Sequence, residues 1–259
     1  MSTEMTPQER EELSRFRYTP ELKDRDKTNI GALLEEEALL SFLEGVKQEI
    51  QAPDLRVAAS VFTKYFAFIP VIYLYSLSAW DKKLAVSLDQ LWLQSNERDG
   101  KWLPEYFFQD VRVEKRADED RNAWRDEALK HLFSEIVFPI VDQLSTKMHL
   151  SRYILWENIS VYISWLYRNI LNPAEAPRAA EDFEYLVQKA PGRLFGPYDR
   201  NPLQLYHAEP EYLEEASEHV YVRKTCCLTY KLGEKRTYCR TCPLYCRKFN
   251  KGKRNRNEY

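Results

Sequence analysis

The segment YILWENISVYISWLY, residues 153–167, carries no charged side chain other than Glu157. A helix that is apolar around its whole circumference is buried inside a protein. We therefore expect a helix over this segment, capped at its start by Ser151, that runs through the interior with other helices packed around it. Glu157 and Asn158 are its polar exceptions. Once buried they need hydrogen-bond partners, either in a structural network or in a ligand site.

A second apolar run, YFAFIPVIYLYSLSAW, covers residues 65–80. Lys64 and Asp81 bound this run and Pro70 divides it, so it is short for a helix that crosses a bilayer. We expect a buried helix pair over residues 55–80 and no transmembrane segment. Peripheral contact with a membrane stays open.

Apolar spacing predicts further helices. Residues 33–50 have the spacing of an amphipathic helix. An apolar stripe from Leu129 to Leu144 predicts another helix, with a kink at Pro139. Residues 172–210 are rich in proline and glycine and predict connectors around one helix, and residues 211–220 predict a last, acidic helix.

Between these helices the pattern changes to that of strands. Two runs rich in Val, Leu and aromatic residues flank NERDG, in which Asp99 and Gly100 form a strong turn signal. We expect a β-hairpin near residues 84–114. The fold class is therefore α+β: a mostly helical domain over residues 1–220, with a central β-hairpin or small antiparallel sheet, and a small cysteine-rich segment over residues 221–259 packed on it.

The N-terminal sequence predicts the cellular compartment, and the C-terminal segment has an excess of positive charge. MSTEMTPQEREELSRF has no basic start and no apolar stretch typical of a secretion signal, so we expect a cytoplasmic protein. Residues 221–259 hold 12 lysines and arginines against two glutamates, although the whole chain has a net charge of −2. Cytoplasmic thiols stay reduced, so cysteines clustered in this basic segment are expected to bind metal or to do redox chemistry.

All five cysteines lie in KTCCLTYKLGEKRTYCRTCPLYC, residues 224–246, where we expect a hairpin that turns at Gly233. Cys239 and Cys242 have the spacing with which two thiolates reach one metal. Cys226 and Cys227 are adjacent and would point to opposite faces of a strand, so either the backbone bends or each reaches a different metal atom. A two-iron cluster offers two metal atoms, whereas zinc usually takes C-x2-4-C pairs.

The ligand set stays open at this point. Cys239, Cys242 and Cys246 together could supply three ligands and leave Cys226 or Cys227 unused. The chain has four histidines, and a mixed His/Cys site is restricted to the two nearest the cysteines, His207 and His219.

Vicinal cysteines followed by C-x-x-C near the end of a chain of this length resemble the FhuF-like ferric-siderophore reductases. The resemblance implies that Cys226, Cys227, Cys239 and Cys242 hold a 2Fe-2S cluster and that the protein reduces siderophore-bound iron in the cytoplasm. WEN at residues 156–158 is also similar to the family. This chain departs from the family pattern by one more residue between the cysteine pairs and by the additional Cys246.

The resemblance also implies a mechanism and partners. One electron converts siderophore-bound iron(III) into iron(II), which hard oxygen donors hold less well, so reduction releases the metal. The substrate would be a ferric siderophore of the citrate or hydroxamate type, and the electron donor a ferredoxin-like protein or a small reductant. Either could be attracted by the basic residues around the cysteines, which are Arg223, Lys224, Arg240, Arg247 and Lys248.

Two other classes of function fit part of the pattern. A zinc-bearing nucleic-acid-binding module would use the KGKRNRN tail on phosphates, but residues 1–220 are acidic and no recognition-helix pattern follows the cysteines, so we expect no nucleic-acid partner. A siderophore-binding or synthetase-like protein would hold a structural metal. No G-x-G-x-x-G fingerprint occurs, so we expect no bound flavin or nicotinamide.

Overall fold

A computed structural model of the chain describes residues 2–116, 120–171, 174, 176–207, 210–213, 217–233 and 237–246. The α-helices are α1 (Pro7–Ser14), α2 (Glu36–Glu49), α3 (Leu55–Phe66), α4 (Phe68–Trp80), α5 (Arg121–Lys130), α6 (Phe138–Met148), α7 (Arg152–Trp165) and α8 (Ala179–Glu184). The strands are β1 (Ser2–Glu4), β2 (Lys27–Asn29), β3 (Lys82–Ala85), β4 (Leu91–Gln94), β5 (Glu97–Arg98), β6 (Lys101–Trp102), β7 (Glu105–Phe108), β8 (Arg112–Lys115), β9 (Glu211–Leu213) and β10 (Glu218–Val220).

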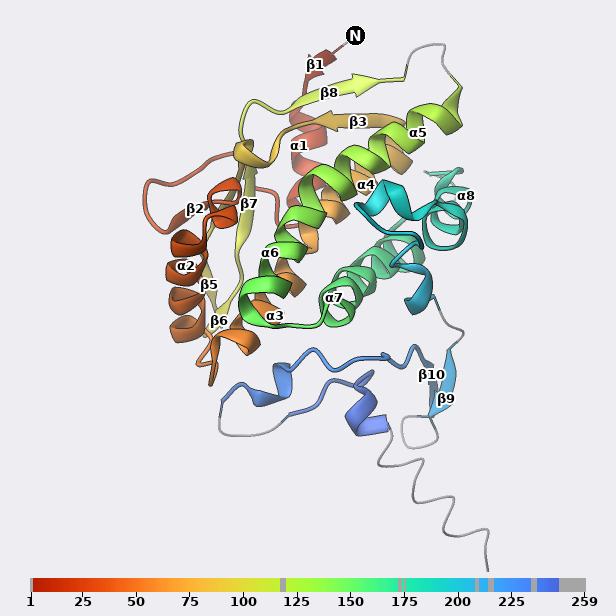
Figure 1. The fold of residues 1–259 in the computed structure, drawn as a ribbon. Coiled ribbons are helices and arrows are strands. Elements are labelled where there is room, and N and C mark those ends of the chain that lie inside the picture. The colour runs from red at the N-terminus through yellow and green to blue at the C-terminus, as the bar shows by residue number, and fades with distance from the viewer. Residues whose placement is uncertain are drawn as a thin grey trace, which may run out of the picture.

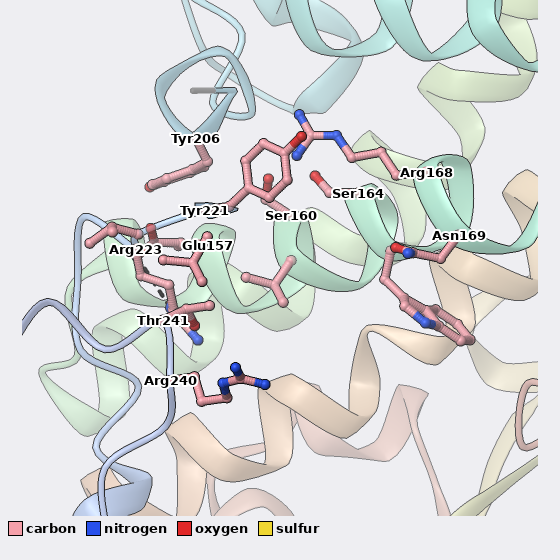
Figure 2. A pocket seen from close by; sticks show the side chains of 14 residues that line it. Glu157, Ser160, Ser164, Arg168, Asn169, Tyr206, Tyr221, Arg223, Arg240 and Thr241 are labelled. Carbon is pink, nitrogen blue, oxygen red and sulfur yellow. Dashed lines mark ion pairs between the residues drawn. The ribbon is translucent and has the colours of Figure 1, made fainter. Parts of the chain in front are cut away.

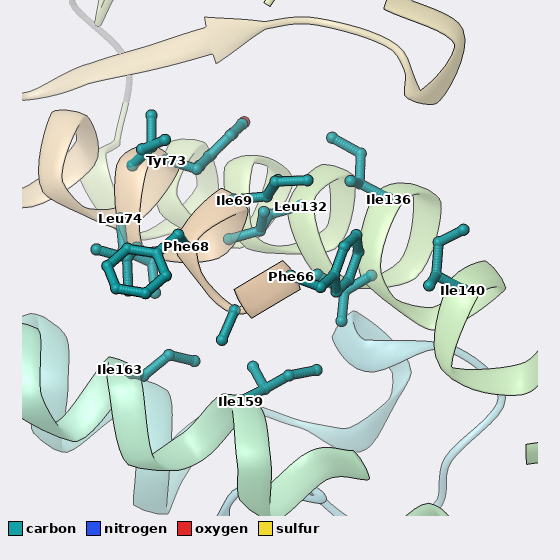
Figure 3. Close-up of a cluster of buried hydrophobic side chains, with 14 of the residues drawn as sticks. Phe66, Phe68, Ile69, Tyr73, Leu74, Leu132, Ile136, Ile140, Ile159 and Ile163 are labelled. Carbon is teal, nitrogen blue, oxygen red and sulfur yellow. The ribbon is translucent and has the colours of Figure 1, made fainter. Parts of the chain in front are cut away.

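The core is made by helices packed around α3 and α4. α3 contacts α2, α4, α6 and α7, and α4 also contacts α7. Figure 3 shows how side chains of α3, of α4, of α7 and of the helix that ends in α6 meet between these elements, with Phe66, Ile136 and Ile159 among them. The sheet that contains β2 and β7 lies beside this bundle, β1, β3 and β8 lie at its upper end, and the cysteine segment lies at the opposite end, near β9 and β10 (Figure 1).

The helix pair predicted over residues 55–80 is confirmed, and it breaks at Ala67. Pro70 is the third residue of α4, in the first turn of the helix, where its missing N–H has no partner to lose. Leu55–Trp80 is long and apolar enough to cross a membrane by length and composition, but 89% of its most apolar window is buried inside the protein.

The helix predicted around Pro139 is also confirmed. α5 passes through a π-helical stretch, His131–Val137, into α6, where Pro139 stands in the first turn. The N–H of Phe138 donates to the carbonyl of Phe133, five residues earlier, which is a π-type hydrogen bond. This wider turn is how the continuous helix accommodates the proline.

Small antiparallel sheets complete the α+β fold, which confirms the predicted class. β4 pairs with β7 and with β2, and the hairpin tip is formed by β5 and β6. At the tip Asp99 (φ 54°) and Gly100 (φ 68°) are both left-handed, as the predicted Asp-Gly turn requires. A second sheet has the strand order β1-β8-β3.

The acidic helix predicted over residues 211–220 is wrong. β9 and β10 form an antiparallel pair there, with His219 opposite Tyr212 and their rings 5.1 Å apart. Ser217, with φ 51°, lies in the turn between the strands. A helix this short is marginal by itself, and the antiparallel pairing of β9 with β10 takes its place.

α7 begins after Ser151, whose side chain accepts the N–H of Tyr153, as predicted. The helix is not buried on every side, however. Tyr153 is 62% exposed and Val161 39% exposed. Val161 lines a cavity between α7 and the cysteine segment.

Candidate cysteine centre and the adjoining cavity

The cysteine segment crosses one end of the helical bundle, below α3 and α7 in Figure 1. It does not form the predicted β-hairpin: within the described residues 221–233 and 237–246 no strand is present. Its two arms are joined by a backbone hydrogen bond from the N–H of Arg223 to the carbonyl of Thr241, at 2.9 Å. Leu228 has φ 63°, and this bend after the adjacent cysteines is incompatible with a regular strand.

Glu157 anchors the first arm. Its carboxylate accepts the backbone N–H of Lys224 at 2.6 Å and that of Thr225 at 2.7 Å, and it also accepts the Thr225 hydroxyl. The Arg223 guanidinium lies 3.7 Å from the same carboxylate, and both side chains are buried. The buried carboxylate of α7 therefore holds the residues immediately before Cys226 in place.

Asn158 makes a second anchor. Its amide nitrogen donates to the carbonyl of Ser60 at 2.9 Å, and its amide oxygen accepts from Arg223 at 2.5 Å. The Ser60 hydroxyl in turn donates to the carbonyl of Cys227 at 2.8 Å. Glu157 and Asn158 thus have a structural role: they join α3, α7 and the segment that carries the paired cysteines.

The cysteines of the two arms meet in pairs. The sulfurs of Cys226 and Cys242 are 4.0 Å apart, and the thiol of Cys239 is hydrogen-bonded to Cys227. Cys246 is directed elsewhere: it is buried beside Val220 and donates to the carbonyl of Arg240 at 3.5 Å. The arrangement therefore gathers four sulfurs and separates the fifth.

No three His, Cys, Asp or Glu side chains in the described part of the chain are close enough together to hold an ion as they stand. The two cysteine pairs are nevertheless neighbours, because Cys226 and Cys239 each interact electrostatically with both Cys227 and Cys242.

Charge and hydrogen bonding favour thiolate at Cys227. The hydrogen bond from Cys239 and the positive charges of Lys64 and Arg223 together lower the pKa of Cys227 to about 4, against the effect of burial. The same hydrogen bond raises the pKa of Cys239, whereas burial raises the pKa of Cys226 to about 11. Thiolate is the form of cysteine that binds metals.

Donors to the sulfurs fit a thiolate-bound metal group. The N–H of Leu228 donates to Cys226 at 3.4 Å, and the Thr229 hydroxyl lies 3.2 Å from the sulfur of Cys227. Lys64 lies 3.2 Å from that hydroxyl. Four thiols with such donors match the all-cysteine set of a 2Fe-2S cluster, in which hydrogen bonds to sulfur help to set the potential, and they also match a zinc site.

A cavity of about 630 Å³ opens beside these cysteines, between α7 and the cysteine segment (Figure 2). The lining residues come from α7 and the turn after it, from Tyr206, and from both arms of the cysteine segment. Arg240 and Thr241, which stand between Cys239 and Cys242, form part of its wall. A molecule in the cavity would therefore touch the loop that carries two of the thiols.

Basic side chains dominate the charge of the cavity. Arg168, Arg223 and Arg240 line it, with Glu157 as the acidic residue among the lining side chains. Glu157 is already paired with Arg223 and with backbone N–H groups. The guanidinium of Arg168 lies 3.8 Å from the ring centroid of Tyr221, and its Nη2 is 3.5 Å from Nδ1 of His207.

The predicted basic residues differ in how far they are buried. Arg223 is buried and paired, whereas Lys224 and Arg240 are exposed; Arg247 and Lys248 lie outside the described residues. Lys64 and Arg168 were not predicted. In the sequence Lys64 only bounds an apolar run, and Arg168 lies at the end of a helix with no motif around it. Neither residue therefore indicated a site.

Comparison with known proteins gives a family match and a structural likeness. The family model described as ferric iron reductase FhuF-like transporter matches residues 62–215, which is more than half of the chain and ends before the cysteines. No curated protein matches the sequence significantly. Aerobactin synthetase IucC from a hypervirulent pathotype of Klebsiella pneumoniae aligns with a TM-score of 0.46 and 15% identity over 71% of this chain. The chain spans about a third of that synthetase, 36% of its length.

Proposed function

The chain belongs to the FhuF-like ferric iron reductase family, and from this premise we propose that it is a cytoplasmic ferric-siderophore reductase with a 2Fe-2S cluster. The proposed ligands are Cys226, Cys227, Cys239 and Cys242. The observation that carries the proposal is that the two cysteine arms bring these thiols together in two pairs, beside a cavity large enough for a small molecule.

When bound, an all-thiolate cluster of this kind supplies one electron at a time, at about −400 mV in plant-type ferredoxins. The substrate is iron(III) held by the hard oxygen donors of a siderophore. Iron(II) is a softer ion of lower charge that such donors hold less well, so accepting one electron leads to release of the metal.

The residues of this chain hold the cysteine arm in position and balance the charge of its thiolates. Glu157 and Asn158 hold the first cysteine arm against α7, so the thiols are presented at a fixed place at the end of the bundle. Lys64 and Arg223 add positive charge near Cys227. Positive charge near a thiolate-bound cluster would favour the reduced, more negative state of the cluster.

The separation of Cys246 supports the proposed ligand set over the alternative that uses it. Its thiol bonds to the carbonyl of Arg240 and packs on Val220, away from the two sulfur pairs. The alternative set would need this side chain to leave its buried position. The electron donor in this proposal is a ferredoxin-like protein or a small reductant.

The visible spectrum of anaerobically purified protein tests the proposal. We expect a red-brown protein with two irons and two sulfides per chain, whose colour bleaches with dithionite and whose reduced form gives a 2Fe-2S electron paramagnetic resonance signal. Colourless protein with one tightly bound zinc would overturn the reductase proposal and favour a structural metal site.

A further inference from the structure

We propose that the cavity between α7 and the cysteine segment binds a carboxylate-bearing, anionic ferric chelate, and that Arg168, stacked on Tyr221, binds its carboxylate. The inference rests on the proposed function and names the substrate class and the residue that selects it.

The position of the cavity is the first argument. Its wall includes Arg240 and Thr241, the two residues between Cys239 and Cys242. A chelate seated there is in contact with the loop that carries these thiols, without a layer of protein between them.

The charge of Arg168 is the second argument. Among the described residues it has no carboxylate partner. Its guanidinium stacks 3.8 Å from the Tyr221 ring centroid, which holds the plane in one orientation and leaves donors at its edge. Such a planar fork matches a carboxylate in a bidentate manner.

The other side chains explain why the charge of the ligand decides binding. Glu157 does not offset Arg168, since its carboxylate is engaged by Arg223 and by the N–H groups of the first cysteine arm. The cavity therefore has an excess of positive charge, which favours an anionic chelate over a neutral one.

The remaining walls suit the arms of such a chelate. Trp165, Tyr206 and Val161 offer apolar surface for methylene chains, and Ser160, Ser164 and Asn169 offer hydrogen-bond partners for amide and hydroxamate oxygens. A volume of about 630 Å³ lies in the range of sites that bury a small organic ligand. A citrate-based chelate with two hydroxamate arms has this combination of groups.

Gallium(III) complexes test the site without any electron transfer, because gallium(III) has the charge and coordination of iron(III) and is not reduced. Two probes are titrated into the purified protein by calorimetry: an anionic gallium complex of a citrate-based dihydroxamate, and a neutral gallium complex of a cyclic trihydroxamate. We expect the anionic complex to bind more tightly, and its binding to weaken as salt is raised.

The decisive variant is Arg168→Gln, which keeps a polar side chain and removes the charge. We expect it to weaken binding of the anionic complex about ten- to a hundredfold, the usual effect of losing a charge-assisted hydrogen bond, and to change binding of the neutral complex less than threefold. Tyr221→Phe keeps the stacking ring and should bind like the wild type, whereas Tyr221→Leu should weaken binding of the anionic complex. Far-UV circular dichroism verifies that each variant is folded.

The matched control is Arg112→Gln, which removes one positive charge from β8, at the opposite end of the molecule from the cysteine segment (Figure 1). It should change neither affinity. Equal affinity of Arg168→Gln and wild type for the anionic complex would overturn the inference, even if the protein reduces iron. Arg168-dependent gallium binding by a protein that holds no cluster would keep the site and reject the reductase function.

Discussion

Glu157 is the residue whose replacement most directly tests how the cysteine arm is held. Its carboxylate accepts two backbone N–H groups, at 2.6 and 2.7 Å, and balances the buried Arg223 at 3.7 Å. In Glu157→Gln the amide oxygen still accepts one N–H, while the amide nitrogen faces the other donor and the Arg223 charge loses its partner. A buried donor left unsatisfied costs about 1–3 kcal/mol, and an unpaired buried charge about 3–5 kcal/mol.

Local relaxation and entry of water reduce these costs, so we expect a net loss of about 3 kcal/mol for the anchored state of the arm. This corresponds to about a hundredfold change in the equilibrium between anchored and detached arm. The helical core buries its side chains independently of this contact, so the arm should detach locally while the bundle stays folded.

Hydrogen exchange of the Lys224 and Thr225 amides measures this opening, because these are the groups that Glu157 accepts. We expect their exchange to accelerate about a hundredfold in Glu157→Gln, with core amides of α3 unchanged. Glu181→Gln is the control, since Glu181 is 67% exposed, lies 3.4 Å from Arg125 and belongs to α8, away from the cysteine segment (Figure 1). Acceleration of less than threefold would refute the role of Glu157 as the anchor.

Three shorter predictions concern the ligand set, the charge network and the hairpin. Replacing any of the four proposed ligands by serine should abolish the visible chromophore, whereas Cys246→Ala should keep it; a spectrum that survives Cys226→Ser but not Cys246→Ala would reverse the assignment. Burial acts to raise the pKa of Asp81, but hydrogen bonds from Arg121 and Arg116 lower it below its usual value. Its ion pairs therefore stabilise the fold above the unfolded-state pKa of about 3.9 and lose this effect as the pH falls through the lower folded pKa. The melting-temperature difference between wild type and Asp81→Asn should shrink between pH 5 and pH 2, and a constant difference would contradict this. Gly100→Ala should lower the free energy of unfolding by about 1 kcal/mol, because alanine is strained at φ 68°, and an unchanged denaturant midpoint would argue against the turn.

Local sequence patterns were sufficient to predict much of the fold. The long apolar segments predicted buried helices, because apolar side chains are stable in the interior of a protein. Asp99-Gly100 predicted the hairpin turn, because these residue types adopt the left-handed backbone that the turn requires. Residues 211–220 were predicted wrongly because a short, charged segment has no strong preference of its own.

The candidate site was likewise predictable from the sequence only in part. Cysteine spacing and the buried Glu157 were evident from the sequence, and the structure brings them together through Lys224 and Thr225. The cavity was not predictable, because α7 reads as apolar on all sides and nothing local shows which face stays open. Lys64 and Arg168 are single basic residues on helices, and only the tertiary fold brings them to the site.

Anaerobic mixing with a ferric siderophore tests the central proposal most directly. Protein reduced with dithionite and freed of excess reductant is mixed with an anionic ferric siderophore in the presence of a ferrous chelator. The account predicts recovery of the oxidised visible spectrum together with one trapped iron(II) per electron, and no iron(II) from metal-free protein. A protein that stays reduced with every ferric siderophore offered, yet is readily oxidised by a ferredoxin, would contradict the account and identify an electron carrier for another acceptor.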